Sequence, residues 1–385
     1  MPVPDFQGGS IVNLMSSIIR ARGGESDYPP LRLLPPEEIA GVTNIVLVVL
    51  DGLGADWLAR ESPDGVLSRN LKGTITSVFP PTTASAITSF LTGDAPQQHA
   101  ITGWHTYLRE LGCVMTVLPG TPRYGGVGYR KAQIDPVRLF GHRSVFDRIA
   151  TRSIVVSPTH IARSDFNLAH LGRAKLLSFE TLPEMFHKTT RALRSGPEPK
   201  YLYLYWPELD SIGHEQGIGS TAAGTHFREI ESALTDFMVS AAGTDTLLLI
   251  TADHGQIDTG DADRIDLADH PELAKCLTLP LCGESRAAFC YLRPNRVDTF
   301  EAYCCDQLSH ALETWPSREL VERGLFGLGR PNLRLGERIG DFVLLMKGNH
   351  VIREWLPFEK PYKLVGVHGG LSEAELKVPL CVFRT

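Results

Sequence analysis

The sequence has little that would direct the protein to a membrane or to nucleic acid. No apolar run in its 385 residues approaches bilayer-spanning length, and one of the longest, Ile45 to Leu50, has only the length of a short strand. No block of five like charges occurs and the formal net charge is −6, so neither nucleic acid nor an anionic membrane is an expected partner. The start of the chain also lacks the ordered charged, apolar and small-residue regions of a signal peptide.

The sequence contains few cysteines, and their spacing matches no paired motif. The seven cysteines are an odd number, and no Cys-x-x-Cys pair occurs, which argues against a redox motif of that kind. We expect mostly reduced thiols and a cytoplasmic location. Internal repeats and low-complexity tracts are absent as well. The oligomeric state is not readable from the sequence.

What the sequence does contain is the balance of an ordinary globular protein, with 43% hydrophobic and 21% charged residues. Apolar, β-branched runs alternate with helical stretches, which predicts an α/β fold with a mostly parallel central sheet and helices on both faces. The predicted strands are 45–50, a short strand in the run "KGTITSVFPP", 153–158, 201–206 and 247–251, and a Thr-rich helix follows the second strand.

Two regions fit this alternation poorly. Residues 104–150 are rich in Gly, Pro, Arg and Tyr, and residues 257–360 contain an isolated strand pattern, "CGESRAAFCYLRP". We assign residues 1–256 and 361–385 to the α/β core and residues 257–360 to an inserted, smaller cap region. We expect the loops that determine substrate specificity to lie in residues 104–150 and 257–360.

Polar side chains follow several predicted strands at the point where each strand ends. Ligands of open α/β sheets bind at the carboxyl ends of strands, so these side chains are expected to meet. A single Asp or His after a strand is usually a turn or capping residue, but a set with one chemistry is harder to explain in that way. The set consists of Asp51, Asp210, His214, Asp253, His254 and His368.

Carboxylate and imidazole groups are ligands that zinc accepts, and no cysteine belongs to the set, which disfavours a structural zinc. Six such ligands are too many for one catalytic zinc ion and suit two divalent metal ions, with Zn²⁺ favoured and Mn²⁺ or another ion as an alternative. Two-metal sites clamp the attacking and leaving oxygens of a phosphoryl displacement. The expected partner is therefore a small phosphoester, with a nucleotide as one option.

The stretch "VFPPTTASAITSFLTG" places two threonines after a double proline, at the start of the predicted helix. A threonine at this position is a good N-cap. It is also well placed as a nucleophile, because helix amides and the helix dipole favour negative charge there. Beside a metal ion, such a hydroxyl would lose its proton readily and attack phosphorus.

In order and approximate spacing, "VVLDGLG", "TTASAITSFLTG", "LDSIGHEQG", "TADHG" and "VHGG" resemble the motifs of the alkaline phosphatase superfamily, and most closely its nucleotide pyrophosphatase/phosphodiesterase (type I phosphodiesterase) branch. The resemblance spans residues 45–370. It implies that the nucleophile precedes the glycine of a Thr-Gly pair by ten residues, which gives Thr83, with Thr82 as the alternate. The threonine pair would then provide both a helix cap and a nucleophile.

The resemblance also implies the division of the metal ligands. Asp51, Asp253 and His254 would bind one ion together with Thr83. The second ion would be bound by Asp210, His214 and His368.

One position departs from the pattern. Relatives that cleave diesters carry an asparagine that braces a phosphate oxygen, and at that count this chain has Trp104, which we include as a substrate-binding candidate. Support for the phosphate must come from elsewhere, and Arg130, Arg143 and Arg286 are candidates. The Cys-x-Pro-x-Arg signature of sulfatases is absent.

The resulting expectation is a metal-dependent hydrolase that cleaves a phosphodiester or a nucleotide pyrophosphate through a phosphothreonine at Thr83. A phosphomonoesterase, a phosphonate hydrolase and a phosphotransferase use the same site and stay open as alternatives. Outside enzymes, the alternatives are a metal- or phosphate-binding protein with an inactive site and an α/β scaffold without metal.

Overall fold

The central feature is a seven-stranded sheet, seen in a computed structural model that describes residues 2–385. Five neighbouring strands are parallel and only β18 runs against its neighbours. This arrangement confirms the predicted fold class. In spatial order the strands are β2 (Leu71–Thr76), β18 (Lys377–Arg384), β9 (Thr246–Thr251), β1 (Asn44–Leu50), β8 (Lys200–Trp206), β6 (Arg152–Pro158) and β7 (Lys175–Phe179).

Strand β1 lies at the middle of this sheet because its apolar residues are covered on both faces. All seven of its residues are buried, as expected for a strand of a parallel sheet between helical layers. In register, Leu50 pairs with Trp206 of β8 and Val49 with Thr251 of β9. The carboxyl ends of three parallel strands therefore meet at one edge, where the loops that follow them lie side by side.

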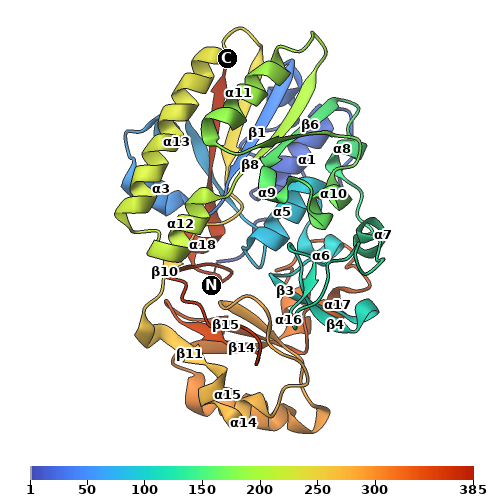
Figure 1. Cartoon of the computed structure of the whole chain (residues 1–385), viewed down its shortest axis with the longest axis vertical. Coiled ribbons are helices and arrows are strands. Elements are labelled where there is room, and N and C mark those ends of the chain that lie inside the picture. The colour runs from blue at the N-terminus through green and yellow to red at the C-terminus, as the bar shows by residue number, and fades with distance from the viewer. Residues whose placement is uncertain (1) are drawn as a thin grey trace.

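Helices cover both faces of the sheet. Figure 1 shows α11 and α13 on one side and α1, α5 and α8 on the other, and α11 packs against α13 as α1 packs against α5. The helices of this part of the chain are α1 (Ile11–Ala21), α2 (Pro36–Ala40), α3 (Ala55–Glu61), α4 (Val66–Arg69), α5 (Thr83–Thr92), α6 (Pro96–His99), α7 (Pro136–Phe140), α8 (Val145–Arg148), α9 (Thr159–Ala162), α10 (Asp165–His170), α11 (Leu182–Leu193), α12 (Glu208–Gln216), α13 (Thr221–Ser240) and α18 (Glu373–Leu376).

A second seven-stranded sheet forms the lower part of the molecule in Figure 1. Its strands, in spatial order, are β14 (Leu312–Pro316), β15 (Phe342–Met346), β13 (Ala287–Cys290), β12 (Cys282–Gly283), β3 (His105–Leu108), β4 (Cys113–Thr116) and β5 (Thr121–Pro122). Residues of β13 alternate between two apolar clusters, Ala287 and Phe289 in one and Ala288 and Cys290 in the other. The sheet is thus packed on both faces.

This second sheet extends beyond the predicted cap of residues 257–360. Strands β3, β4 and β5 come from residues 105–122, which the prediction assigned to the core. The join is a pairing of β3 with β12, made by His105 and Gly283. A pairing between residues so far apart in the chain leaves no local pattern in the sequence. The segment that contains β3, β4 and β5 and the predicted cap region therefore form one sheet together.

The remaining elements connect the two sheets or extend the second. They are β10 (Ile257–Asp258), paired with β17 (Gly366–Val367), and β11 (Arg264–Asp266), paired with β16 (Val351–Arg353), together with α14 (Pro271–Ala274), α15 (Val297–Leu308), α16 (Ser317–Glu322) and α17 (Leu335–Arg338). Within residues 2–385, no helix combines the length and the apolar character needed to cross a bilayer.

Candidate active site

Asp51 and Asp253 lie at the shared edge of the first sheet, directly after β1 and shortly after β9. The Asp51 amide donates to the carbonyl of Trp206 at 2.9 Å, which holds the turn against β8. Both carboxylates are buried, and the Tyr205 hydroxyl donates to Asp51 Oδ2. The amides of Gly52 and His254 donate to Asp253 Oδ1 at 3.3 and 3.0 Å. The turns after two parallel strands thus fix two acids side by side.

Asp210 and His214 lie on successive turns of α12. They are on the face of this helix that is next to the carboxyl ends of β1 and β9. His214 Nε2 lies 3.1 Å from Asp210 Oδ2, the contact that i,i+4 spacing on a helix permits. The Nδ1 of His214 is 2.8 Å from the carbonyl oxygen of Gly366, and that of His254 is 3.1 Å from the carbonyl oxygen of Gly255. When Nδ1–H donates to a carbonyl, Nε2 keeps the lone pair with which imidazole binds metal.

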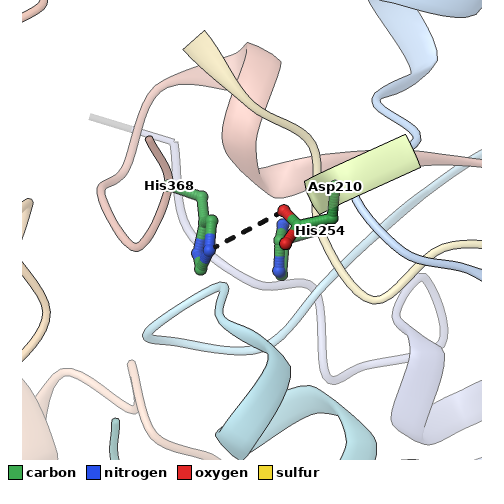
Figure 2. A group of neighbouring side chains, drawn as sticks. All are labelled: Asp210, His254 and His368. Carbon is green, nitrogen blue, oxygen red and sulfur yellow. Dashed lines mark ion pairs between the residues drawn. The ribbon is translucent and has the colours of Figure 1, made fainter. Parts of the chain in front are cut away.

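His368 comes to the site from the loop after β17, near the C-terminus. Its ring stacks on that of His254 with centroids 3.7 Å apart, and Figure 2 shows the two rings beside Asp210. His368 Nε2 lies 3.9 Å from Asp210 Oδ1. The structure therefore brings together all six side chains that the sequence predicts as metal ligands, from four separate segments of the chain.

The donor set fits divalent cations. Two groups have ligand atoms within 4.8 Å of one another: Asp51, Asp253 and His254, and Asp210, His254 and His368. The first matches the predicted division, while the second contains His254 in place of His214, which lies beside Asp210 instead. Asp51 Oδ1, Asp253 Oδ2 and His368 Nδ1 are buried without a hydrogen-bond partner among the described residues. Buried acceptors of this kind are normally paired or bound to a metal ion.

The pKa shifts of the ionisable side chains also favour a site for cations. Burial, followed by repulsion from Asp253 and Asp210, raises the pKa of Asp51, and burial also raises the pKa of Asp253. Burial opposes the charge of Asp210 as well, but the neighbouring His214 outweighs it and lowers the pKa of that carboxyl. Burial and the nearby His254 lower the pKa of His368, which keeps its ring neutral. Cations among these groups would offset the repulsion between carboxylates.

The two threonines at the start of α5 point to different partners. Thr83 is the first residue of the helix, and its Oγ1 lies 3.2 Å from His254 Nε2, beside the first metal-ligand group. Thr82 occupies the N-cap position, but its hydroxyl donates to Glu284 Oε1 at 2.7 Å and accepts no helix amide. The prediction that a threonine side chain caps the helix is therefore wrong, because the Thr82 hydroxyl is oriented toward the Glu284 carboxylate and not toward a helix amide. Thr83 has the geometry expected of a nucleophile.

Trp104 is placed by the same carboxylate. Its amide donates to Glu284 Oε1 at 2.6 Å. The contact depends on a close approach of two loops, since a Cβ on Gly103 would lie 2.6 Å from the Cα of Gly283, whose φ is +76°. Burial raises the pKa of Glu284 to about 7, against the hydrogen bonds from Thr82 and Trp104, which lower it. Sequence reasoning missed Glu284, and its one available signal was the glycine before it.

Two cavities meet at Thr83 and Trp104. A cavity of about 640 Å³ opens between the two sheets, and we call it the polar cavity because its wall contains ionisable side chains, among them Glu284, His214 and His368. An apolar cavity of about 490 Å³ lies on the other side and is lined by residues that include Leu91, Leu118, Phe146, Phe166 and Leu176. Thr83, Trp104 and Asp210 line both cavities, and the role of Trp104 in substrate binding stays a prediction.

None of the three arginines proposed as phosphate ligands lines either cavity. Arg286 is buried in a bidentate ion pair with Glu375, and Arg130 pairs with Asp165 at 3.2 Å. Arg143 donates to the carbonyl of Asp147. The structure instead places Arg123 in the wall of the polar cavity, in a region that the sequence identified only by its composition.

The sequence profile of the family described as "Type I phosphodiesterase / nucleotide pyrophosphatase" matches residues 45–371. A sequence search of curated proteins finds no match. Among solved structures, the fold is similar to murine ectonucleotide pyrophosphatase/phosphodiesterase 5 (16% identity, 87% of each chain covered, TM-score 0.64) and to its human counterpart (15% identity, 88% of this chain and 87% of that one, TM-score 0.66).

A third similar structure is phosphonoacetate hydrolase from Sinorhizobium meliloti, solved in complex with phosphonoformate (18% identity, 88% of this chain and 89% of that one, TM-score 0.63). At these identities the solved structures support the fold alone. The profile match, which covers most of the chain and contains all six candidate ligands and Thr83, supports the family. The chain belongs to the type I phosphodiesterase/nucleotide pyrophosphatase family, a family of phosphoric ester hydrolases.

Proposed function

We propose that the protein is a metal-dependent phosphodiesterase that forms a phosphothreonine at Thr83. The observation that carries the proposal is the position of Thr83 Oγ1, 3.2 Å from His254 at the start of α5, where two metal-ligand groups and two cavities meet. The first ion would be held by Asp51, Asp253 and His254 with Thr83. The second would be held by Asp210, His214 and His368, with zinc as the expected metal for both ligand sets.

When bound, two divalent cations supply Lewis acidity and neutralise charge that develops in the transition state. Thr83 Oγ1 gives its proton to solvent and bonds to phosphorus, while the bond between phosphorus and the leaving-group oxygen breaks; that oxygen keeps the electron pair and takes up a proton from solvent. The amides at the start of α5 stabilise the negative charge that develops beside Thr83. Water then attacks the phosphothreonine and restores the Thr83 hydroxyl.

A phosphodiester is favoured over a monoester because two cavities, rather than one, open at Thr83. A phosphodiester carries two organic substituents, and the polar and apolar cavities offer each of them a separate site. A monoester would leave one of these cavities without a substituent to bind. The apolar walls around Leu118 and Phe146 suit a flat or aliphatic group, since burial of apolar surface drives its binding.

The test is a rate comparison between an aryl phosphodiester and the matching aryl phosphomonoester, with zinc supplied. Thr83→Ala and a chelator serve as controls, and Thr82→Ala is the matched variant one residue away. We expect a diester preference, a loss of at least about 10⁴-fold in kcat for Thr83→Ala, and a zinc content near two per chain in both variants. Full activity of Thr83→Ala would refute the nucleophile, and a monoester preference would refute the substrate class.

A phosphonate hydrolase is the second candidate, because the same six ligands and Thr83 would serve C–P cleavage. The similarity in fold to phosphonoacetate hydrolase motivates the comparison. Product analysis with phosphonoacetate separates the two, since release of acetate and phosphate requires cleavage of the C–P bond. No such release is expected if the protein is a phosphodiesterase.

A further inference from the structure

Glu284 is a carboxylate at the reaction site that neither metal-ligand group contains. Its Oε1 accepts two hydrogen bonds, from the Thr82 hydroxyl at 2.7 Å and from the Trp104 amide at 2.6 Å. Its Oε2 has no hydrogen-bond partner within residues 2–385, and the side chain lines the polar cavity. One oxygen therefore anchors the carboxylate next to Thr83, and the other is free to accept a hydrogen bond from a ligand.

The other acids of the polar cavity are compensated. Arg123 binds Glu359 with Nε and NH2 at 2.8 and 3.0 Å, and the same guanidinium lies 4.0 Å from Glu354. Arg353 donates to backbone carbonyl oxygens, and Lys360 is an exposed side chain of the wall without an ion pair among the described residues. Glu284 is consequently the one acid of the cavity wall, outside the candidate metal ligands, that has no cationic partner.

On the proposed function, one substituent of the phosphodiester occupies the polar cavity. Thr83, His214 and His368 line this cavity, and the two histidines do not line the apolar one. A substituent that extends into it from phosphorus beside Thr83 therefore meets the wall that contains Glu284.

We propose that Glu284 recognises the substituent bound in the polar cavity, and that this substituent carries a hydrogen-bond donor, either a hydroxyl or an ammonium group. The inference rests on the proposed function and narrows its substrate class. A carboxylate oxygen without a partner attracts a donor and repels an anion. The indole of Trp104 and the neighbouring rings of Trp355 and Tyr362 add aromatic surface that attracts a cationic group.

The experiment uses three diesters of phenyl phosphate whose second phenol carries a 4-aminomethyl, a 4-hydroxymethyl or a 4-carboxylate group. Each is tested at about pH 8.5, above the pKa of Glu284, with the zinc-loaded wild type and with Glu284→Gln, which keeps an acceptor for Thr82 and Trp104 but removes the charge. The ratio of kcat/KM between wild type and variant cancels the intrinsic reactivity of each phenol. Charges about 6 Å apart at an effective dielectric constant between about 80 and 20 change this ratio by about 3- to 100-fold.

We expect the ratio to be highest for the ammonium substituent, intermediate for the hydroxyl and lowest for the carboxylate. Glu301→Gln is the matched control, because Glu301 is an exposed acid on α15 that lines neither cavity. The same series is measured as dissociation constants for the inactive Thr83→Ala protein and for Thr83→Ala combined with Glu284→Gln. Equal ratios across the series in both measurements would overturn the role of Glu284.

The two proposals fail separately. If the wild type hydrolyses none of the diesters, the proposed function fails, and the dissociation constants still decide the role of Glu284. An affinity order of ammonium, hydroxyl and carboxylate that Glu284→Gln abolishes would support that role. Undetectable or unselective binding would overturn it.

Discussion

The buried ion pair between Arg286 and Glu375 joins the second sheet to the loop that carries His368, and its removal should weaken both stability and metal binding. Arg286 Nε and NH2 donate to the two oxygens of Glu375 at 3.1 and 2.8 Å, and the side chains are 1% and 0% exposed. The same carboxylate accepts from the Gly370 amide at 2.7 Å and from the Ser372 hydroxyl at 2.6 Å. Gly370 is two residues beyond His368.

Removing one partner leaves a buried charge without compensation, which costs about 3–5 kcal/mol. We therefore expect Arg286→Met and Glu375→Leu each to lower the free energy of unfolding by about that amount. The double variant should cost less than either single variant, because it leaves no uncompensated charge. The loop around Gly370 loses its anchor in each variant, and support from residues outside the metal ligands is typically worth about 10- to 100-fold in metal affinity.

The assay is urea unfolding in the presence of a chelator, so that metal binding does not contribute to the measured stability. Zinc affinity is measured separately by competition with a chelating dye. Single variants that cost less than about 1 kcal/mol, the range of an exposed ion pair, would refute the reasoning. Strict additivity in the double variant would refute it as well, because independent sites add and a coupled pair does not.

Three further predictions follow from other parts of the molecule. Burial lowers the pKa of His170 to about 4 from 6.5, so the folded state takes up fewer protons than the unfolded state. The free energy of unfolding therefore falls as the pH drops below about 6.5, by about 2 kcal/mol between pH 7 and pH 5. In urea unfolding, His170→Asn should flatten this pH dependence, and an unchanged dependence would contradict the assignment. Removal of metal by a chelator should lower Tm, and two equivalents of zinc should restore it, because repulsion among Asp51, Asp210 and Asp253 returns without cations; a Tm independent of metal would contradict the site. Arg123 donates to the carbonyls of Leu281 and Glu354 as well as to the Glu359 carboxylate. We therefore expect Arg123→Met to speed hydrogen exchange in residues 354–364 and to raise KM about 10-fold, with little change in global stability. Exchange at the wild-type rate would show that Arg123 does not hold this segment.

Much of the first sheet was predictable because its signals are local. The run "NIVLVVL" is apolar at every position, as a strand buried on both faces requires, and Asp51 follows it directly. Parallel strands bring their carboxyl ends to one edge, so Asp51 and Asp253 could be expected together before any coordinates were known. The i,i+4 spacing of Asp210 and His214 likewise needed only the prediction that their segment is helical, which α12 confirms.

The antiparallel strand β18 and the extent of the second sheet were not predictable in the same way. Strand β18, at the end of the chain, pairs with β2 and β9. Strand β3 pairs with β12 through His105 and Gly283, which are far apart in the sequence. Such pairings depend on long-range contacts that leave no periodic pattern of their own. The domain prediction consequently missed the contribution of residues 105–122 to the second sheet.

The sequence by itself determined the candidate chemistry of the site, since the identity, order and strand-end positions of six candidate ligands and a threonine pair are properties of the chain. Tertiary structure decided which hydroxyl of the pair faces the metal ligands, because Glu284 takes the hydrogen bond of Thr82 and leaves Thr83 beside His254. It also decided the surroundings of the reaction. Glu284 and Trp104 are 180 residues apart and meet only because two hairpins of the second sheet approach closely at Gly103 and Gly283, where a side chain would not fit.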